Sequence, residues 1–216
     1  MNRPLEGGHV QPVASQRQLS TDENTGRSAC GRAPTLSAED KQELLRLARQ
    51  TLRDHLSEAK SPRPQTDSPV LLEPCASFVT LRRRDSGELR GCRGECPARR
   101  SLVESVAKMV IAAATDDSRF SPVTVDEVSS LRIEISALSP MKPIEPEEIV
   151  VGKHGLLIIK GHESGLLLPQ VPMRLGWNRE RFLRGLCQKA HLPEGAWKTK
   201  GAQLYAFETE TWEEEG

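Results

Sequence analysis

Between residues 37 and 56, apolar residues recur every three or four positions. This spacing predicts an amphipathic helix. Ser37 is suited to cap this helix, and Asp40 follows three residues later, where an acidic side chain completes a cap. Residues 61–69 hold three prolines in nine positions and predict a linker. The apolar face of the helix comprises Leu44, Leu45, Ala48, Leu52 and Leu56.

After the linker, the pattern changes to a hairpin, a helix and a strand. Residues 75–81 and 88–92 read as two strands, with Asp85-Ser86-Gly87 as the turn between them. Apolar residues at helical spacing follow from 102 to 114. Residues 131–138 then alternate between apolar and polar side chains, which predicts a strand with one buried face.

The same order of elements occurs a second time without obvious residue identity. Residues 155–160 and 166–168 predict another hairpin, and Asn178 is placed to cap a helix that ends before Pro193. Residues 204–207 predict the closing strand. Because a hairpin cannot bury its apolar face alone, we expect an α+β fold, with a duplicated hairpin-helix-strand unit forming mainly antiparallel sheets with flanking helices.

Composition separates an N-terminal segment from this domain. Residues 1–34 contain no aromatic residue and many Gly, Ser, Arg, Gln and Pro residues. Such a segment buries too little apolar area to offset its ordering entropy, so we expect it to be disordered. Residues 35–216 are expected to form a single domain, and the repeat allows two subdomains within it.

Charge and hydropathy narrow the class of protein. The chain has 216 residues with 30 basic and 30 acidic side chains, which excludes a globally basic nucleic-acid-binding protein. No run of 18 apolar residues and no N-terminal apolar stretch is present, so we expect neither a membrane span nor a secretory signal. Five cysteines is an odd number, which favours reduced thiols and a cytoplasmic location.

The stretch from Glu88 to Cys96 holds the most unusual chemistry. Gly91 and Gly94 bracket Cys92, and glycines there would let a ligand approach the backbone closely. Arg90 and Arg93 flank the thiol, and positive charge favours the thiolate form. These neighbours predict a reactive Cys92, while the alternative is a buried structural thiol.

Arginine is concentrated around this cysteine. The segment from Arg82 to Arg100 contains seven arginines and only three acidic residues, so its local net charge is +4. The acidic residues are Asp85, Glu88 and Glu95. This patch is a candidate for binding an anionic small molecule or for docking a partner protein. Binding to unpaired RNA is disfavoured, because only 4% of the residues are aromatic.

Metal and cofactor signatures are weak. Cys92 and Cys96 have a spacing that zinc sites tolerate, but no second close pair of Cys or His accompanies them. The sequence also lacks a nucleophile elbow and a phosphate-binding loop. We therefore expect no metal and no cofactor.

Several segments in order resemble one known family. Leu89-Arg90-Gly91-Cys92-x-Gly94 is similar to the signature of the AmmeMemoRadiSam system protein A family, the relatives of a human protein linked to a syndrome with Alport features. The resemblance covers roughly residues 40–212. It also includes Phe78–Leu81, Asp117–Phe120, Ile135–Pro140, Val151–Leu156, Leu167–Val171, Gly176-Trp177 and Leu186–Ala190.

The resemblance implies an α+β fold built from a duplicated unit with swapped strands. It also implies association with a Memo-type protein and a radical S-adenosylmethionine enzyme. It gives no established reaction, so whether the chain is an enzyme stays open at this point. The leading hypothesis is a cytoplasmic accessory protein or enzyme component, and the alternative is a non-catalytic interaction module in which Cys92 is structural.

The leading hypothesis assigns roles to particular side chains. Cys92 would be a nucleophile or covalent carrier. His154, which precedes a predicted strand, would be a base near neutral pH. Arginine suits bidentate contact with carboxylate or phosphate, so Arg90 and Arg119 would bind an anionic group. The remaining residues expected at the ligand site are Gly91, Gly94, Asp117 and Gln170. We expect Asp117 to pair with Arg119.

Overall fold

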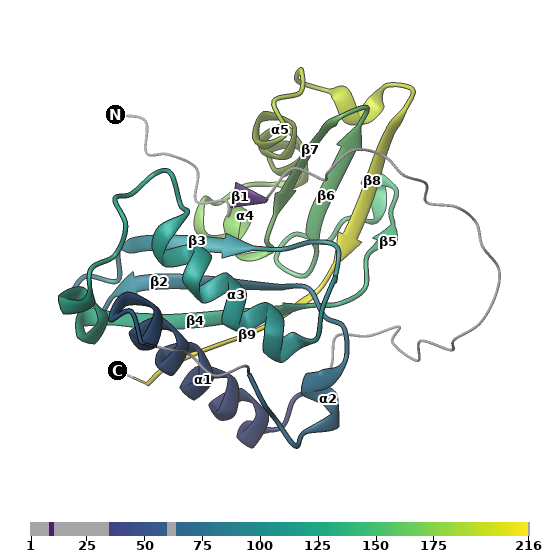
Figure 1. Cartoon of the computed structure of the whole chain (residues 1–216). Helices are drawn as coiled ribbons and strands as arrows, with labels where there is room; N and C mark the ends of the chain where they lie inside the picture. Colours follow the sequence, from purple (N-terminus) through teal and green to yellow (C-terminus); the bar gives the residue numbers. More distant parts are fainter. Residues whose placement is uncertain (1–8, 11–34, 60–63, 216) are drawn as a thin grey trace. The chain divides into compact units, whose positions relative to one another are not determined.

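The computed structural model describes residues 9–10, 35–59 and 64–215 (Figure 1). These residues form two compact units. Unit 1 comprises residues 35–138 and 209–215 with strand β1 (His9–Val10), and unit 2 comprises residues 139–208. Apart from β1, the segment 1–34 that we predicted to be disordered lies outside the described residues.

The sheet of unit 1 has the strand order β1-β3-β2-β4-β9. The central strand β2 is antiparallel to both β3 and β4, and β4 is antiparallel to β9. Only the short β1 is parallel to its neighbour. The long strands are β2 (Ser77–Arg83), β3 (Leu89–Gly94), β4 (Leu131–Leu138) and β9 (Thr209–Glu213).

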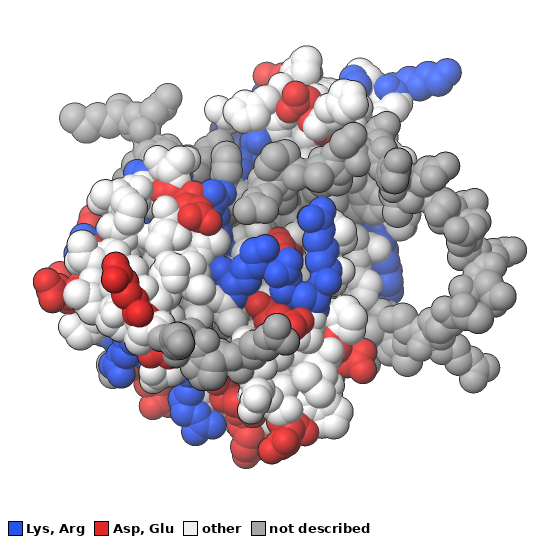
Figure 2. All heavy atoms as spheres, viewed as in Figure 1, with Lys and Arg blue, Asp and Glu red and all other residues white. Residues whose placement is uncertain are grey.

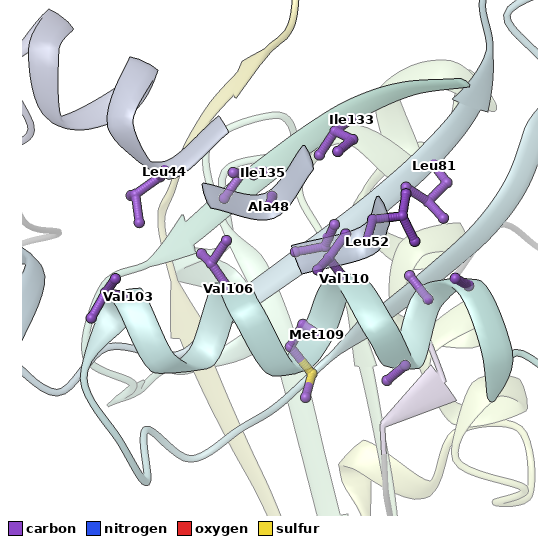
Figure 3. Close-up of a cluster of buried hydrophobic side chains, with 14 of the residues drawn as sticks. Leu44, Ala48, Leu52, Leu81, Val103, Val106, Met109, Val110, Ile133 and Ile135 are labelled. Atoms are coloured by element: carbon purple, nitrogen blue, oxygen red, sulfur yellow. The ribbon is translucent and has the colours of Figure 1, made fainter. Parts of the chain in front are cut away.

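Two helices pack on one side of this sheet. The predicted cap of helix α1 (Ala38–Leu56) is confirmed, since Asp40 N donates to Ser37 Oγ at 3.1 Å and Ser37 N donates to Asp40 Oδ2 at 2.9 Å. Figure 3 shows apolar side chains of α1 and of helix α3 (Leu102–Thr115) meeting those of β2 and β4. Unit 1 also contains helix α2 (Pro69–Leu72) and the 3₁₀ helix η1 (Val125–Ser130).

Unit 2 has its own sheet and its own core. The strand order is β5-β8-β6-β7, and every neighbouring pair is antiparallel. Helix α5 packs its predicted apolar face into the core, where Phe182, Leu186 and Cys187 are fully buried. The elements are β5 (Lys142–Pro143), β6 (Gly155–Lys160), β7 (Glu163–Leu167), α4 (Gln170–Arg174), α5 (Arg179–Lys189), β8 (Ala202–Phe207) and the 3₁₀ helices η2 (Pro146–Glu148) and η3 (Ala196–Lys198).

The repeat expected from the sequence extends to the sheet topology. In unit 1 the order β3-β2-β4 places the closing strand beside the first hairpin strand, and β7-β6-β8 does the same in unit 2. The strand after each closing strand then joins the other sheet: β5 follows β4 in the chain and pairs with β8, while β9 follows β8 and pairs with β4. The two antiparallel sheets with flanking helices confirm the α+β prediction.

Candidate functional site

Cys92 lies on the face of the unit 1 sheet that points away from α3. On strand β2, Val79 and Leu81 belong to the core beneath the helices, so Thr80 between them points to the opposite face. The register places Thr80 directly opposite Cys92 on β3 and directly opposite Glu134 on β4. A thiol, a hydroxyl and a carboxylate thus form a row across three adjacent strands, which we call the Cys92 row.

This sheet face carries polar side chains that are nonetheless shielded from solvent. Thr80, Arg82 and Ser136 are all buried. Buried polar groups are more informative than buried apolar ones, because each needs a partner to offset its desolvation. This sheet face therefore differs from the apolar face under α1 and α3 in carrying buried side chains that hydrogen-bond to one another.

Cys92 makes two hydrogen bonds, one through its sulfur and one through its backbone N–H. Thr80 Oγ1 donates to Cys92 Sγ at 3.3 Å, and Cys92 N donates to Asp117 Oδ2 at 2.9 Å. Cys92 is only 6% exposed. Burial raises the pKa of the Cys92 thiol, while the Thr80 hydroxyl and the Arg119 guanidinium act in the opposite direction and only partly offset it.

The thiol is consequently neutral at pH 7. Our expectation that flanking arginines make Cys92 a ready thiolate is wrong, because burial outweighs the positive charge. Arg93 donates instead to the Asp116 carbonyl. The neighbouring Cys96 is no more acidic, since burial raises its pKa to about 12.

Asp117 and Arg119 form the ion pair that the sequence predicted. Arg119 Nε donates to Asp117 Oδ1 at 2.9 Å and Arg119 Nη2 donates to Asp117 Oδ2 at 2.6 Å. Asp117 is 4% exposed; burial alone would raise its pKa, but Arg119 and the Cys92 N–H hold it below the usual range. The carboxylate therefore stays ionised and links the guanidinium to the backbone of Cys92.

Arg90 has a different role from the one expected. It is 6% exposed rather than a surface charge. Arg90 Nε and Nη2 donate to the two oxygens of Glu127 at 2.9 and 3.0 Å, and the remaining donors reach the carbonyls of Ser121 and Pro122. With its guanidinium committed in this way, Arg90 is a structural ion-pair partner, and its assignment as an anion-binding residue is withdrawn.

The two signature glycines serve packing. Neither Gly91 nor Gly94 has a positive φ, so neither needs to be glycine for its backbone conformation. A Cβ at Gly91 would lie 2.0 Å from the carbonyl oxygen of Ala113, and one at Gly94 would lie 2.3 Å from the ring of Phe78. Gly91 lets α3 approach β3, and Gly94 leaves room for an aromatic ring on the neighbouring strand.

His154 and Gln170 belong to unit 2. His154 precedes β6, as predicted, and its Nδ1 accepts a hydrogen bond from Val150 N at 3.2 Å within a turn. Gln170 begins helix α4 and is half-buried. Their roles as base and ligand contact stay predictions.

The charge of the arginine-rich stretch is partly offset by four carboxylates, three of which lie outside the stretch. Five of its seven arginines form ion pairs with carboxylates, and Figure 2 shows Lys and Arg side chains beside Asp and Glu side chains. The net charge of +4 counted along the sequence therefore overstates the positive charge in space. The pairs are Arg82–Glu134, Arg83–Glu127, Arg84–Glu214, Arg90–Glu127 and Arg100–Glu95.

Sequence comparison places this site in a family. A family model described as AMMECR1 matches residues 45–212. The chain belongs to the AMMECR1 family. Protein PH0010 of Pyrococcus horikoshii is 42% identical over 182 residues, which cover 80% of this chain and 88% of the relative. Protein MK0488 of Methanopyrus kandleri is 38% identical over 188 residues, covering 83% of this chain and 91% of the relative.

A solved structure supports the fold of this AMMECR1 family member. The crystal structure of PH0010, described as an uncharacterized protein, superposes with a TM-score of 0.76 and covers 80% of this chain and 90% of that chain. The names of these relatives state no activity. In the part of the chain that the structure describes, no helix has the length and apolar character needed to cross a bilayer.

The raised pKa of Cys92 leads to a pH-dependent prediction. Native Cys92 should react with iodoacetamide at least about tenfold more slowly at pH 7 than in urea, and the rate should rise steeply above pH 9, because the thiolate is the nucleophile. Cleavage after glutamate separates the peptide 89–95, with Cys92, from 96–104, with Cys96, so each thiol can be followed by mass spectrometry. Equal rates in native and unfolded protein at pH 7 would contradict the burial of this thiol.

Proposed function

We propose that this chain is a thiol-dependent component of a system that includes a Memo-type protein and a radical S-adenosylmethionine enzyme. The observation that carries the thiol site is the convergence of Thr80 and Arg119 on Cys92. Thr80 donates directly to the sulfur, and Arg119 is anchored through Asp117 to the Cys92 backbone. Both groups stabilise negative charge on sulfur.

Arg119 suits the recognition of an anionic substrate. Its side chain is 23% exposed, in contrast to the 2% of Asp117 and the 7% of Arg90. Arg119 Nε and Nη2 both donate to Asp117, so Arg119 would attract an anion through its positive charge rather than through that paired edge. Because Asp117 fixes Arg119 beside Cys92, an anion bound there has its neighbouring atoms close to the sulfur.

The chemistry best matched to a neutral, high-pKa thiol is addition to a carbonyl carbon. The Cys92 S–C bond forms while the C=O π pair moves to oxygen, and the S–H proton ends on that oxygen, so no oxidant or reductant is needed. A thiolate of high pKa is a strong nucleophile and a poor leaving group, which favours a lasting adduct.

The partners follow from the family resemblance of the Leu89–Gly94 signature. We expect this chain to work in the cytoplasm. Purified Memo-type and radical S-adenosylmethionine proteins encoded in the same genome as this chain should bind it with micromolar or tighter affinity. The measurement is titration calorimetry, together with co-elution in size-exclusion chromatography. Cys92→Ser should still bind, since one buried sulfur contributes little to a protein interface.

The outcomes separate the parts of the proposal. If no complex forms at micromolar concentration, the partnership is wrong. If a complex forms and the complex with Cys92→Ser has the same catalytic activity as the complex with the wild type, Cys92 is structural. The chain is then a non-catalytic interaction module. Cys187→Ser, which alters a buried cysteine in the other unit, is the matched control.

A further inference from the structure

A cavity lies wholly within unit 2, along the outer side of helix α5. Its volume is about 430 Å³, which is within the range of small-molecule sites. Its lining includes Trp177, Arg181, Gly185, Gln188 and Glu194, and we call it the α5 pocket. The Cys92 row belongs to unit 1, so this pocket is a separate site.

Trp177 lines the α5 pocket, and the edge of its six-membered ring lies against the helix at Gly185. Gly185 is buried within α5, and a Cβ there would lie 2.3 Å from Cζ3 of Trp177. Glycine therefore lets the indole lie against the helix, and Trp177 also packs against the core of unit 2. A flat aromatic surface beside open space favours a planar ring as its partner.

The polar groups of the pocket leave one cation unpaired. Arg184 is held by two carboxylates, Glu180 at 2.8 Å from Nη2 and Glu194 at 3.1 Å from Nε. Arg181 lies one turn before Gly185, and its exposed side chain has no carboxylate partner among the described residues. Because both Glu180 and Glu194 pair with Arg184, the charge of Arg181 is the one that an anionic group could balance.

We propose that the α5 pocket binds a small aromatic carboxylate. The ring lies on the Trp177 indole, and the carboxylate is held by Arg181, whose guanidinium offers paired donors. Gln188, two turns of helix after Arg181, supplies an amide as a further hydrogen-bonding group. This inference does not depend on the proposed function of the Cys92 row.

Phenylacetate is a suitable probe, because it joins a phenyl ring to one carboxylate. The chain has three tryptophans, whose indole N–H signals can be followed by ¹H–¹⁵N NMR and assigned with Trp177→Phe. We expect phenylacetate to shift the Trp177 signal with a Kd of about 1 mM or tighter. Phenylacetamide, which keeps the ring and lacks the charge, should bind at least about tenfold more weakly.

Two variants make the test specific. Arg181→Gln should weaken phenylacetate binding at least about tenfold, whereas Arg53→Gln removes an exposed arginine of α1 in unit 1 and should leave it unchanged. Arg181 is exposed, so its replacement does not threaten the fold. An unshifted Trp177 signal, equal binding of phenylacetamide, or undiminished binding by Arg181→Gln would each overturn the proposal.

Discussion

Replacement of Glu127 by alanine is expected to lower the free energy of unfolding by about 3–5 kcal/mol. The reason is the partner left behind: Arg90 has a side chain only 7% exposed, and it would keep a buried positive charge without a carboxylate. Glu127 also accepts a hydrogen bond from Thr124 N at the start of η1, which the variant loses. Urea denaturation followed by circular dichroism measures the change.

Asp126→Ala is the matched control for this variant. Asp126 is the exposed neighbour of Glu127 on the same 3₁₀ helix, and its removal should change stability by less than about 0.5 kcal/mol. The combined Arg90→Ala and Glu127→Ala protein should lose less stability than the sum of the single losses, because the two residues interact directly. A loss below about 1 kcal/mol for Glu127→Ala would show that this ion pair does not support the fold.

The same pair predicts a specific acid sensitivity. The Arg90 guanidinium, opposed by desolvation, lowers the pKa of Glu127 to about 2. A carboxyl with a depressed folded-state pKa stabilises the fold above its ordinary pKa, and that stability is lost as the pH falls toward the folded value. The wild type should therefore lose about 3 kcal/mol from this group between pH 4.5 and 2, and Glu127→Gln should show a flatter profile over that range.

Replacement of Gly91 by alanine is the second change with a large expected effect, a loss of about 3 kcal/mol. The added Cβ would lie 2.0 Å from the carbonyl oxygen of Ala113, so β3 and α3 must move apart. Backbone atoms cannot rotate away as a flexible side chain can. Thermal or urea unfolding measures the loss.

Gly87→Ala separates steric crowding from conformational strain. Gly87 has φ +69° and nothing within 4 Å of an added Cβ, so its replacement costs only the left-handed conformation, about 1 kcal/mol. Gly91 has the opposite combination, with no positive φ and a backbone contact. If Gly91→Ala proves no worse than Gly87→Ala, the close approach of α3 to β3 is not what requires glycine.

The fold was predictable where a segment shows its own periodicity. The hairpins, α1, α3 and α5 each contribute regularly spaced apolar residues to a core, and this spacing is visible in the sequence without knowledge of neighbours. Strand β9 was missed, because Thr209–Glu213 carries two glutamates and lacks an aliphatic run. Its strand conformation depends on pairing with β4, more than seventy residues earlier in the chain.

The site was predictable only where its residues are neighbours in the sequence. Asp117 and Arg119 are two positions apart, and their ion pair was expected. The partner of Arg90 lies 37 residues away, and nothing near Arg90 in the sequence indicates that it is buried. Thr80 and Glu134 join Cys92 through strand register, and the alternation of apolar residues around Thr80 was the signal that could have placed it.

If Arg119 directs anionic substrates to the Cys92 thiol, alkylation of Cys92 should favour a negatively charged reagent. Thiolates ordinarily react faster with neutral iodoacetamide than with iodoacetate, which is repelled. At pH 9, the ratio of the iodoacetate rate to the iodoacetamide rate at native Cys92 should exceed the ratio in the unfolded chain by about tenfold.

Arg119→Gln should abolish this preference, whereas Arg93→Gln should retain it, since Arg93 is the next residue of β3 and points to the opposite face of the sheet. The peptide 96–104 reports Cys96 as an internal control in the same digest. We expect a raised ratio at Cys92 in the wild type and in Arg93→Gln, and an ordinary ratio in Arg119→Gln. A ratio equal to that of the unfolded chain, or one that Arg119→Gln leaves unchanged, would contradict it.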